Sequence, residues 1–126
     1  MKRMRLSLAA LTTVALLAAC GGTPSGQSTV DPADADVSVT SVDIAFEQTT
    51  LTAPAGEAFT LALVNEDPVP HNVAIYTDSS ASDDLYIGEY VTDGTIVYEV
   101  PALEPGEYVF RCDLHPEMVG TLIVEG

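Results

Sequence analysis

Hydrophobic and polar residues alternate with a period of two along several stretches between about residue 37 and residue 126. This period is typical of β-strands that bury one face and expose the other. The alternation therefore predicts strands rather than helices. The residues expected to face inward are Thr40, Val42, Ile44 and Phe46 in a first strand, Phe59, Leu61 and Leu63 in a second, and Ile96, Tyr98 and Val100 in a third.

Turn-forming residues separate these strands. They lie at residues 53–56 (Ala-Pro-Ala-Gly), 93–94 (Asp-Gly) and 104–106 (Glu-Pro-Gly), where proline and glycine favour the backbone angles of tight turns. No long helical periodicity is present, and only residues 79–85 could hold a short helical turn. The spacing predicts an all-β fold, a Greek-key β-sandwich of seven to eight strands.

The amino-terminal residues have the pattern of an export signal. A basic start precedes an apolar stretch of 12 residues at positions 6–17, which is shorter than the ~20 residues of a membrane-spanning helix. The Leu-Ala-Ala-Cys sequence that ends at Cys20 resembles a bacterial lipobox. We expect residues 1–19 to be a lipoprotein signal peptide and Cys20 to be lipidated. An ordinary secretory peptide, with a disulfide between Cys20 and Cys112, is the alternative.

Residues 20–36 are small, polar and proline-containing, with too few apolar side chains to form a core. This composition predicts a lipidated amino terminus followed by a flexible linker. Residues 37–126 are then one small domain. The expected location is extracytoplasmic, with the domain lipid-anchored to the outer face of the bacterial cytoplasmic membrane.

The candidate chemistry lies in sulfur and imidazole side chains. Cys112, His115 and Met118 follow one another at intervals of three residues, and they include the only cysteine and the only methionine beyond Cys20. The one other histidine, His71, lies in an Asp-Pro-Val-Pro-His-Asn segment. Two imidazoles, a thiolate and a weak thioether form the ligand set of a mononuclear blue-copper site. The sequence therefore predicts one copper ion held by these four side chains.

Each of these residues also has an ordinary structural alternative. His71 could be a surface turn residue, and His115 could cap a loop. Cys112 could be a small buried hydrophobic residue and Met118 a core filler. The metal site is favoured because both histidines, together with the only sulfurs beyond the lipobox, fall in the pattern of a single ligand set.

The strand that precedes the ligand loop predicts how such a site is built. Tyr108, Phe110 and Cys112 alternate onto one face, so the thiol should point toward the core. Cys112 and His71 lie at strand ends and should be covered. One edge of His115 should reach solvent, because this residue lies on the ligand loop.

From about residue 37 to residue 126 the chain resembles the cupredoxins, which are type 1 blue copper proteins of the amicyanin and plastocyanin kind. The resemblance implies that Asn72 ties the two ligand-bearing segments together. It also implies a role around the metal for Pro116, which lacks an N–H and cannot donate to the cysteine sulfur. The residues that carry the resemblance are Phe46, the Pro-Ala-Gly-Glu of 54–57, Asn65, His71, Asn72, Gly106, Tyr108, Phe110, Cys112, His115, Met118, Gly120 and Val124.

Charge restricts the possible partners. Beyond Cys20 one arginine stands against 19 acidic residues, a net charge of −18 with neutral histidines. This charge excludes nucleic acid, would steer a basic redox partner, and leaves the lipid as the only attachment to a membrane. Solubility alone is an equal explanation for the acidic surface. The residues expected to form an uncharged docking patch around His115 are Pro68, Val69, Pro70, Leu114 and Pro116.

These features predict a monomeric electron carrier and no enzyme activity. Its partners would be redox proteins such as a c-type cytochrome, an oxidase or a dehydrogenase. A periplasmic copper-binding or delivery protein with the same ligands is the alternative, although a rigid cage with a thiolate disfavours ready release of metal. A copper oxidase or nitrite reductase would need further copper centres, which two histidines cannot supply.

Overall fold

The computed structural model describes residues 27–126, which form nine β-strands and one short 3-10 helix. The predicted signal peptide and Cys20 lie outside the described residues. Within the described residues, no helix has the length and apolar character needed to cross a membrane. In chain order the elements are η1 (Pro32–Asp34), β1 (Val37–Val42), β2 (Ala45–Phe46), β3 (Thr50–Pro54), β4 (Phe59–Asn65), β5 (Ala74–Tyr76), β6 (Asp84–Ile87), β7 (Gly94–Val100), β8 (Gly106–Arg111) and β9 (Val119–Glu125).

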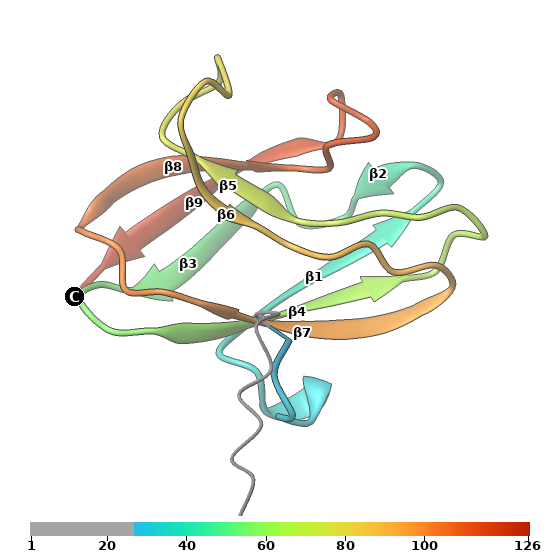
Figure 1. Cartoon of the computed structure of the whole chain (residues 1–126), viewed down its shortest axis with the longest axis horizontal. Coiled ribbons are helices and arrows are strands. Elements are labelled where there is room, and N and C mark those ends of the chain that lie inside the picture. The colour runs from blue at the N-terminus through green and yellow to red at the C-terminus, as the bar shows by residue number, and fades with distance from the viewer. Residues whose placement is uncertain (1–26) are drawn as a thin grey trace, which may run out of the picture.

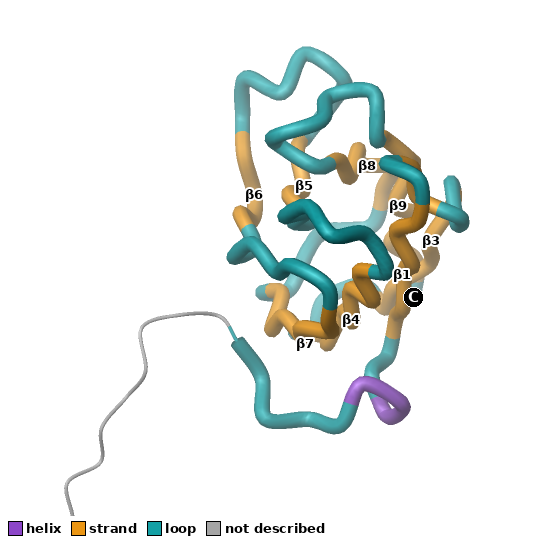
Figure 2. The backbone as a smooth tube through the Cα atoms, turned by 90° about the vertical axis from the view of Figure 1, so that its right-hand side faces the viewer, coloured by secondary structure: helices purple, strands orange, loops and turns teal. Residues whose placement is uncertain are grey.

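The strands form two sheets that enclose one core (Figure 1, Figure 2). One sheet has the order β2-β1-β4-β7 and the other the order β3-β9-β8-β5-β6. Both sheets are mixed, because β1 runs parallel to β4 and β3 parallel to β9. The predicted all-β sandwich is confirmed, with nine strands in place of seven or eight. The short helical turn considered for residues 79–85 does not form, since these residues lead through a turn into β6.

The core is built largely from the residues predicted to face inward on β4 and β7. Pairing of the two strands places Phe59 opposite Val100, Leu61 opposite Tyr98 and Leu63 opposite Ile96, and all six are buried. Full burial of one such side chain contributes about 1.5–3 kcal/mol to the stability of the fold. The second sheet and its loops add Leu51, Ala53, Val73, Ile75, Phe110, Cys112, Met118, Leu122 and Val124 to the same core.

The prediction for the first strand is wrong in part, because Phe46 is buried as expected but Thr40, Val42 and Ile44 are not. The buried residues of β1 are Val37, Val39 and Ser41, whereas Thr40 and Val42 are only half-buried. A single strand through residues 40–46 was expected, but β1 ends at Val42 and the chain reverses into β2. The alternation in the sequence therefore spans a hairpin, and the inward-facing set of β1 shifts by one residue.

The tip of this hairpin is strained. Asp43 (φ 54°) and Ile44 (φ 56°) lie between the paired residues Val42 and Ala45, and both adopt the left-handed conformation, as a two-residue hairpin turn requires. This conformation costs a residue with a Cβ about 1–2 kcal/mol, and it is rare for a β-branched residue. The side chain of Ile44 is exposed rather than in the core. Contacts outside the hairpin must therefore hold the turn in place.

Part of the predicted linker lies against the domain. The N–H of Ser28 donates to the carbonyl oxygen of Val97 at 2.7 Å, and Gln27 forms an isolated antiparallel bridge with Tyr98. These contacts add the segment to the free edge of β7. The folded unit in the structure therefore begins ahead of Val37, the start expected from the sequence.

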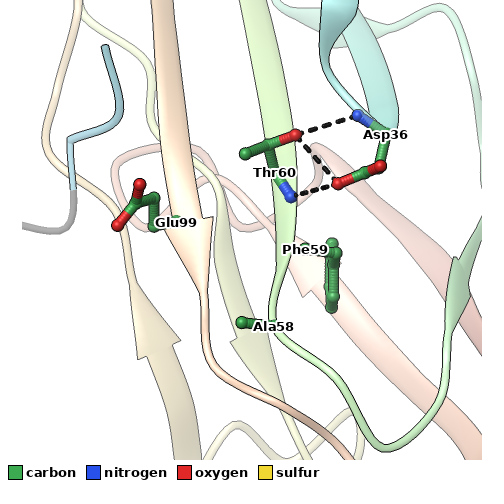
Figure 3. A pocket seen from close by; sticks show the side chains of 5 residues that line it. All are labelled: Asp36, Ala58, Phe59, Thr60 and Glu99. Carbon is green, nitrogen blue, oxygen red and sulfur yellow. Dashed lines mark hydrogen bonds between the residues drawn. The ribbon is translucent and has the colours of Figure 1, made fainter. Parts of the chain in front are cut away.

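Asp36 connects the end of this segment to β4. Its carboxylate accepts the N–H of Thr60 at 2.8 Å and the hydroxyl of Thr60 at 3.0 Å, while the N–H of Asp36 donates to Thr60 Oγ1 at 2.9 Å (Figure 3). Both residues line a shallow hollow of about 250 Å³ together with Ala58, Phe59 and Glu99. The hollow lies where β4 begins, at the opposite end of this strand from Asn65.

Gly120 on β9 provides a test of this packing. A Cβ at this position would overlap the ring of Phe110 and lie 2.7 Å from the carbonyl oxygen of Thr49. We expect Gly120→Ala to lower the free energy of unfolding by about 1–3 kcal/mol, because the buried Phe110 ring and the backbone at Thr49 would have to shift to make room for the methyl group. Gly106→Ala on the adjacent strand is the matched control, since its nearest neighbour would lie at 3.8 Å. Urea unfolding of both variants measures the difference, and equal stability would contradict the packing described.

Candidate metal centre

The backbone of His71 is fixed within the loop between β4 and β5. Its N–H donates to the carbonyl oxygen of Val91 at 3.0 Å, and its own carbonyl oxygen accepts the N–H of Val91 at 2.9 Å. Asn65, at the end of β4, closes the same loop: its side-chain amide donates to the carbonyl oxygens of Val69 (2.9 Å) and Val91 (2.7 Å). The loop therefore presents His71 from a defined position although it is not part of a strand.

The second ligand-bearing segment is a tight loop between β8 and β9. The N–H of Cys112 donates to the carbonyl oxygen of Met118 at 3.0 Å, and the N–H of Met118 donates to the carbonyl oxygen of His115 at 2.8 Å. A longer bond of 3.3 Å joins the N–H of His115 to the carbonyl oxygen of Cys112. These nested turns fix the three residues relative to one another by backbone hydrogen bonds alone.

Three side chains converge between the two segments. The Nδ1 atoms of His71 and His115 lie 3.2 Å apart, and each lies 3.7 Å from Sγ of Cys112. His71 and Cys112 are fully buried, whereas His115 is half-buried. The structure thus confirms the covered positions of His71 and Cys112 and the partial exposure of His115.

The spacing of these atoms fits a single metal ion. Donors at about 2.0–2.3 Å from one ion, spread by about 100–130°, lie roughly 3.2–4 Å from one another. The three observed separations fall in that range. Because the donors are two imidazole nitrogens and one sulfur, the set suits copper, with a thiolate that favours Cu(I) and imidazoles that accept both oxidation states. The residues present therefore fit the copper ion predicted from the sequence.

Met118 is the fourth predicted ligand. Its side chain is buried, with 1% exposure, at the point where the loop returns to β9. A thioether at this position can act as the weak axial ligand of the set, and the side chain is also part of the hydrophobic core. The assignment of Met118 stays a prediction.

Asn72 joins the two ligand-bearing segments, as the resemblance implied. Its side-chain oxygen accepts the N–H of Asp113 at 2.9 Å, and its side-chain amide donates to the carbonyl oxygen of Gly88 at 3.0 Å. The carboxylate of Asp113 accepts the hydroxyl of Tyr76 at 2.6 Å and lies 3.4 Å from Nε of Arg111. Asp113, the residue after Cys112, is therefore held both at its backbone N–H and at its carboxylate.

The environment of Tyr76 agrees with this contact. Burial, followed by the hydrogen bond and the charge of Asp113, raises the pKa of Tyr76, although Arg111 opposes the shift. The Arg111 guanidinium lies 4.9 Å from the centre of the Tyr76 ring. The phenol therefore stays protonated and remains a donor to the carboxylate.

His71 makes a second contact on the far side of its ring. Nε2 lies 2.7 Å from Oδ2 of Asp67, a residue with 6% exposure. Burial opposes ionisation of Asp67, but hydrogen bonds from His71 and from the N–H groups of Ile44 and Asp43 outweigh it and lower the pKa of this carboxyl. The ring of His71 thus lies between the Asp67 carboxylate at Nε2 and the candidate ligands Cys112 and His115 at Nδ1.

The residues predicted to surround His115 are accessible. Leu114 is 50% exposed, Pro68, Pro70 and Pro116 are exposed, and Val69 is half-buried. Pro116 follows His115 directly and does not take part in the backbone bonds that close the loop. Whether these residues contact a partner stays a prediction.

Sequence reasoning missed two carboxylates of this site, Asp67 and Asp113. The sequence analysis notes Asp67 only as the start of the Asp-Pro-Val-Pro-His-Asn segment, and it does not single out Asp113. A signal for Asp67 was present, since metal-ligating histidines commonly donate their second N–H to a carboxylate. No pattern in the sequence indicates that Tyr76 reaches Asp113, because this contact depends on the pairing of β5 with β8.

The family of the chain follows from comparison with known proteins. The model of the cupredoxin-like domain family matches residues 7–124. The chain therefore belongs to the cupredoxin-like family, in agreement with its two-sheet fold and its His-Cys-His cluster.

Individual relatives are similar over much of their length. Amicyanin from Paracoccus versutus is 32% identical over 133 residues, which cover 98% of this chain and 97% of amicyanin. The crystal structure of that amicyanin gives a TM-score of 0.58 at 35% identity, covering 75% of this chain and 85% of the other. Reduced auracyanin from Roseiflexus castenholzii gives 0.61 at 20% identity, covering 69% and 94%, and shows a likeness of fold alone.

Proposed function

We propose that this protein is a blue-copper electron carrier that binds one copper ion at a mononuclear type 1 site formed by His71, Cys112, His115 and Met118. The observation that carries the proposal is the preformed cluster, in which two Nδ1 atoms and one Sγ atom lie within 4.8 Å of one another. When bound, copper supplies a centre that can gain and lose one electron. The similarity to amicyanin supports the same choice.

The rigidity of the site favours electron transfer over metal delivery. Backbone hydrogen bonds fix both segments, and three of the four proposed ligands are buried. A cage that scarcely moves between oxidation states keeps the reorganisation barrier to electron transfer low. A delivery protein must instead release its metal, which these buried ligands oppose. Electron transfer is therefore the better account of this geometry.

His115 provides the route for the electron. It is the only one of the three converging ligands that is not fully buried, and it lies between the exposed residues Leu114 and Pro116. The neighbouring loop adds Pro68 and Pro70, which are also exposed and uncharged. A redox partner such as a c-type cytochrome, an oxidase or a dehydrogenase would dock on this patch, where little polar surface has to be desolvated.

The cellular location is part of the same proposal. The lipobox-like sequence ending at Cys20 supports export and lipid attachment at the outer face of the bacterial cytoplasmic membrane. The acidic domain would be repelled by anionic lipid, so the lipid anchor would provide the only attachment to the bilayer. The protein would then act as a monomer close to membrane-bound redox proteins.

The thiolate of Cys112 provides the first test of the copper site. Cys112→Ser replaces the one strongly charge-donating ligand with a hydroxyl, so the intense visible absorption of the copper-loaded protein should vanish. Some copper can still bind through the two histidines. Visible and electron paramagnetic resonance spectra of copper-loaded wild type and variant make the comparison. A wild-type protein without intense absorption, or a variant that keeps it, would contradict the type 1 assignment.

Leu114 provides a test of the electron route. Leu114→Glu places an unpaired charge in an apolar contact, which costs a few kcal/mol when the contact is desolvated. We expect self-exchange of electrons to slow roughly a hundredfold, which corresponds to ~2.8 kcal/mol. The rate is measured at high salt, where net repulsion is screened. Copper affinity and colour should scarcely change, because Leu114 is not a ligand.

Val30→Glu is the matched control for Leu114→Glu. Val30 is exposed beside η1, on a segment that is not part of the docking patch, and it receives the same change in charge. Its self-exchange rate should equal that of the wild type. Equal rates in all three proteins would mean that electrons leave by a different face.

Cys20 provides a test of the location. In a bacterial host, Cys20→Ser should release the domain from the membrane fraction or leave the precursor unprocessed. Because a single acyl chain holds a protein only marginally, mass spectrometry of the wild type should find two or more chains on Cys20. Recovery of a fully soluble mature wild type with an unmodified Cys20 would exclude the anchor, and it would leave the copper site untouched.

A further inference from the structure

Asp67 is a buried carboxylate that lies between the β1–β2 turn and His71. Its Oδ1 accepts the N–H of Asp43 at 2.7 Å, and its Oδ2 accepts the N–H of Ile44 at 3.1 Å. The same Oδ2 lies 2.7 Å from Nε2 of His71. The N–H of Asp67 itself donates to the side-chain oxygen of Asn65 at 2.8 Å. One side chain thus connects the hairpin tip to a candidate ligand.

The chemistry of these partners determines the direction of each hydrogen bond. A backbone N–H can only donate and a carboxylate can only accept, so the contact with the ring requires a proton on Nε2. A neutral imidazole has a single N–H. The Nδ1 atom of His71 therefore keeps its lone pair, and this atom faces Sγ of Cys112 at 3.7 Å and Nδ1 of His115 at 3.2 Å.

We propose that Asp67 is a positioning residue for the metal ligand His71, and that the strained β1–β2 turn fixes Asp67 for this task. The carboxylate selects the tautomer that can bind a metal and sets the rotation of the ring. Two adjacent N–H groups of a left-handed turn hold the carboxylate, one at each oxygen, and Oδ2 also faces the ring. The left-handed turn thereby serves the metal centre through the N–H of Ile44, although Ile44 is not itself a ligand.

This inference rests on the copper site proposed above and adds a determinant of its affinity. Without the carboxylate, the ring of His71 could adopt the other tautomer, and a metal would then have to displace a proton. Loss of an outer partner of a histidine ligand commonly weakens metal binding by about 10–100-fold. We expect a loss of that size when Asp67 is replaced.

The test begins with the tautomer in the metal-free, reduced wild-type protein. Proton–nitrogen correlation spectra of the isotope-labelled protein, recorded where the rings are uncharged, identify the protonated nitrogen of each histidine. We expect His71 to carry its proton on Nε2. A proton on Nδ1 of His71 in the wild type would overturn the proposal, and this measurement depends on no variant.

Asp67→Asn is the sharpest variant, because it changes little except the charge and one acceptor. With the amide oxygen in place of Oδ1, the NH2 faces both the N–H of Ile44 and Nε2 of His71, and with the oxygen in place of Oδ2 the NH2 faces the N–H of Asp43. The amide therefore offers the ring a donor in one orientation and an acceptor in the other, and neither orientation satisfies all three groups. We expect His71 to lose its exclusive Nε2–H tautomer, and Cu(I) affinity, measured by competition with a chromophoric chelator, to fall about 10–100-fold.

Two variants separate this role from general effects of charge and strain. Glu66→Gln removes the charge next to Asp67 in the sequence, from a side chain that is exposed. Ile44→Gly relieves the left-handed strain and keeps the N–H that Asp67 accepts. Both should retain the Nε2–H tautomer of His71 and the wild-type affinity for Cu(I).

The outcomes distinguish this inference from the proposed function. If Asp67→Asn retains both the wild-type tautomer and the Cu(I) affinity of Glu66→Gln, Asp67 does not position His71. If the tautomer changes as expected and affinity falls, the inference holds, even in a protein whose copper form shows no blue absorption. If the copper form shows no blue absorption, the proposed electron-carrier function is refuted, whereas the role of Asp67 in positioning His71 is not.

Discussion

The metal centre depends on the antiparallel pairing of β5 with β8. This pairing places Ala74 opposite Arg111 and Ile75 opposite Phe110. The residues beyond each strand end are then neighbours as well, and the hydrogen bond from the N–H of Asp113 to Asn72 extends the contact. A shift of one residue in this register would turn Phe110 and Cys112 away from the core. The packing that sets the register therefore also brings the thiol to the histidines.

The charge of the molecule is arranged around the same pairing. All 19 acidic residues lie in the described part of the chain, where Arg111 is the only lysine or arginine. That one cation lies beside Asp113, the carboxylate that follows Cys112. Arg111 thus offsets the negative charge nearest to Cys112. Leu114 and Pro116, which flank His115, are uncharged, whereas Glu117 on the same loop is exposed.

Much of the site could be predicted from the sequence, because its chemistry is concentrated in rare residues. The cluster of His71, Cys112 and His115 rests on residue types that occur once or twice beyond the signal segment. The strands β4 and β7 were also predictable, since every second residue from Phe59 to Leu63 and from Ile96 to Val100 is large, apolar or aromatic, and buried. These features depend on local pattern alone.

Other features depend on contacts between residues that are distant in the sequence, and no local sequence pattern predicts these contacts. The alternation from Thr40 to Phe46 matches one strand as well as a hairpin, and only the left-handed turn at Ile44 distinguishes the two. That turn is stabilised by Asp67, which is distant in sequence. In the same way, residues 27–36 have a linker-like composition, yet they gain order from backbone hydrogen bonds to β7 and side-chain bonds to Thr60. The composition of residues 27–36 shows how little apolar surface they can bury. It does not show that the edge of β7 is free to pair with them.

The donor atoms of the site are in contact with protein atoms rather than left without partners. Nδ1 of His71 lies against His115, its Nε2 against Asp67, and Sγ of Cys112 against both rings. Within the described residues, no buried side-chain nitrogen or oxygen lacks a hydrogen-bond partner. Copper would stabilise the folded state by binding to it, while the sandwich itself, through β5, β8 and the turn that holds Asp67, determines where the ligands are. A site whose geometry comes from the protein is the arrangement that a carrier of single electrons requires, since the ion then changes oxidation state within a cage that does not have to rearrange.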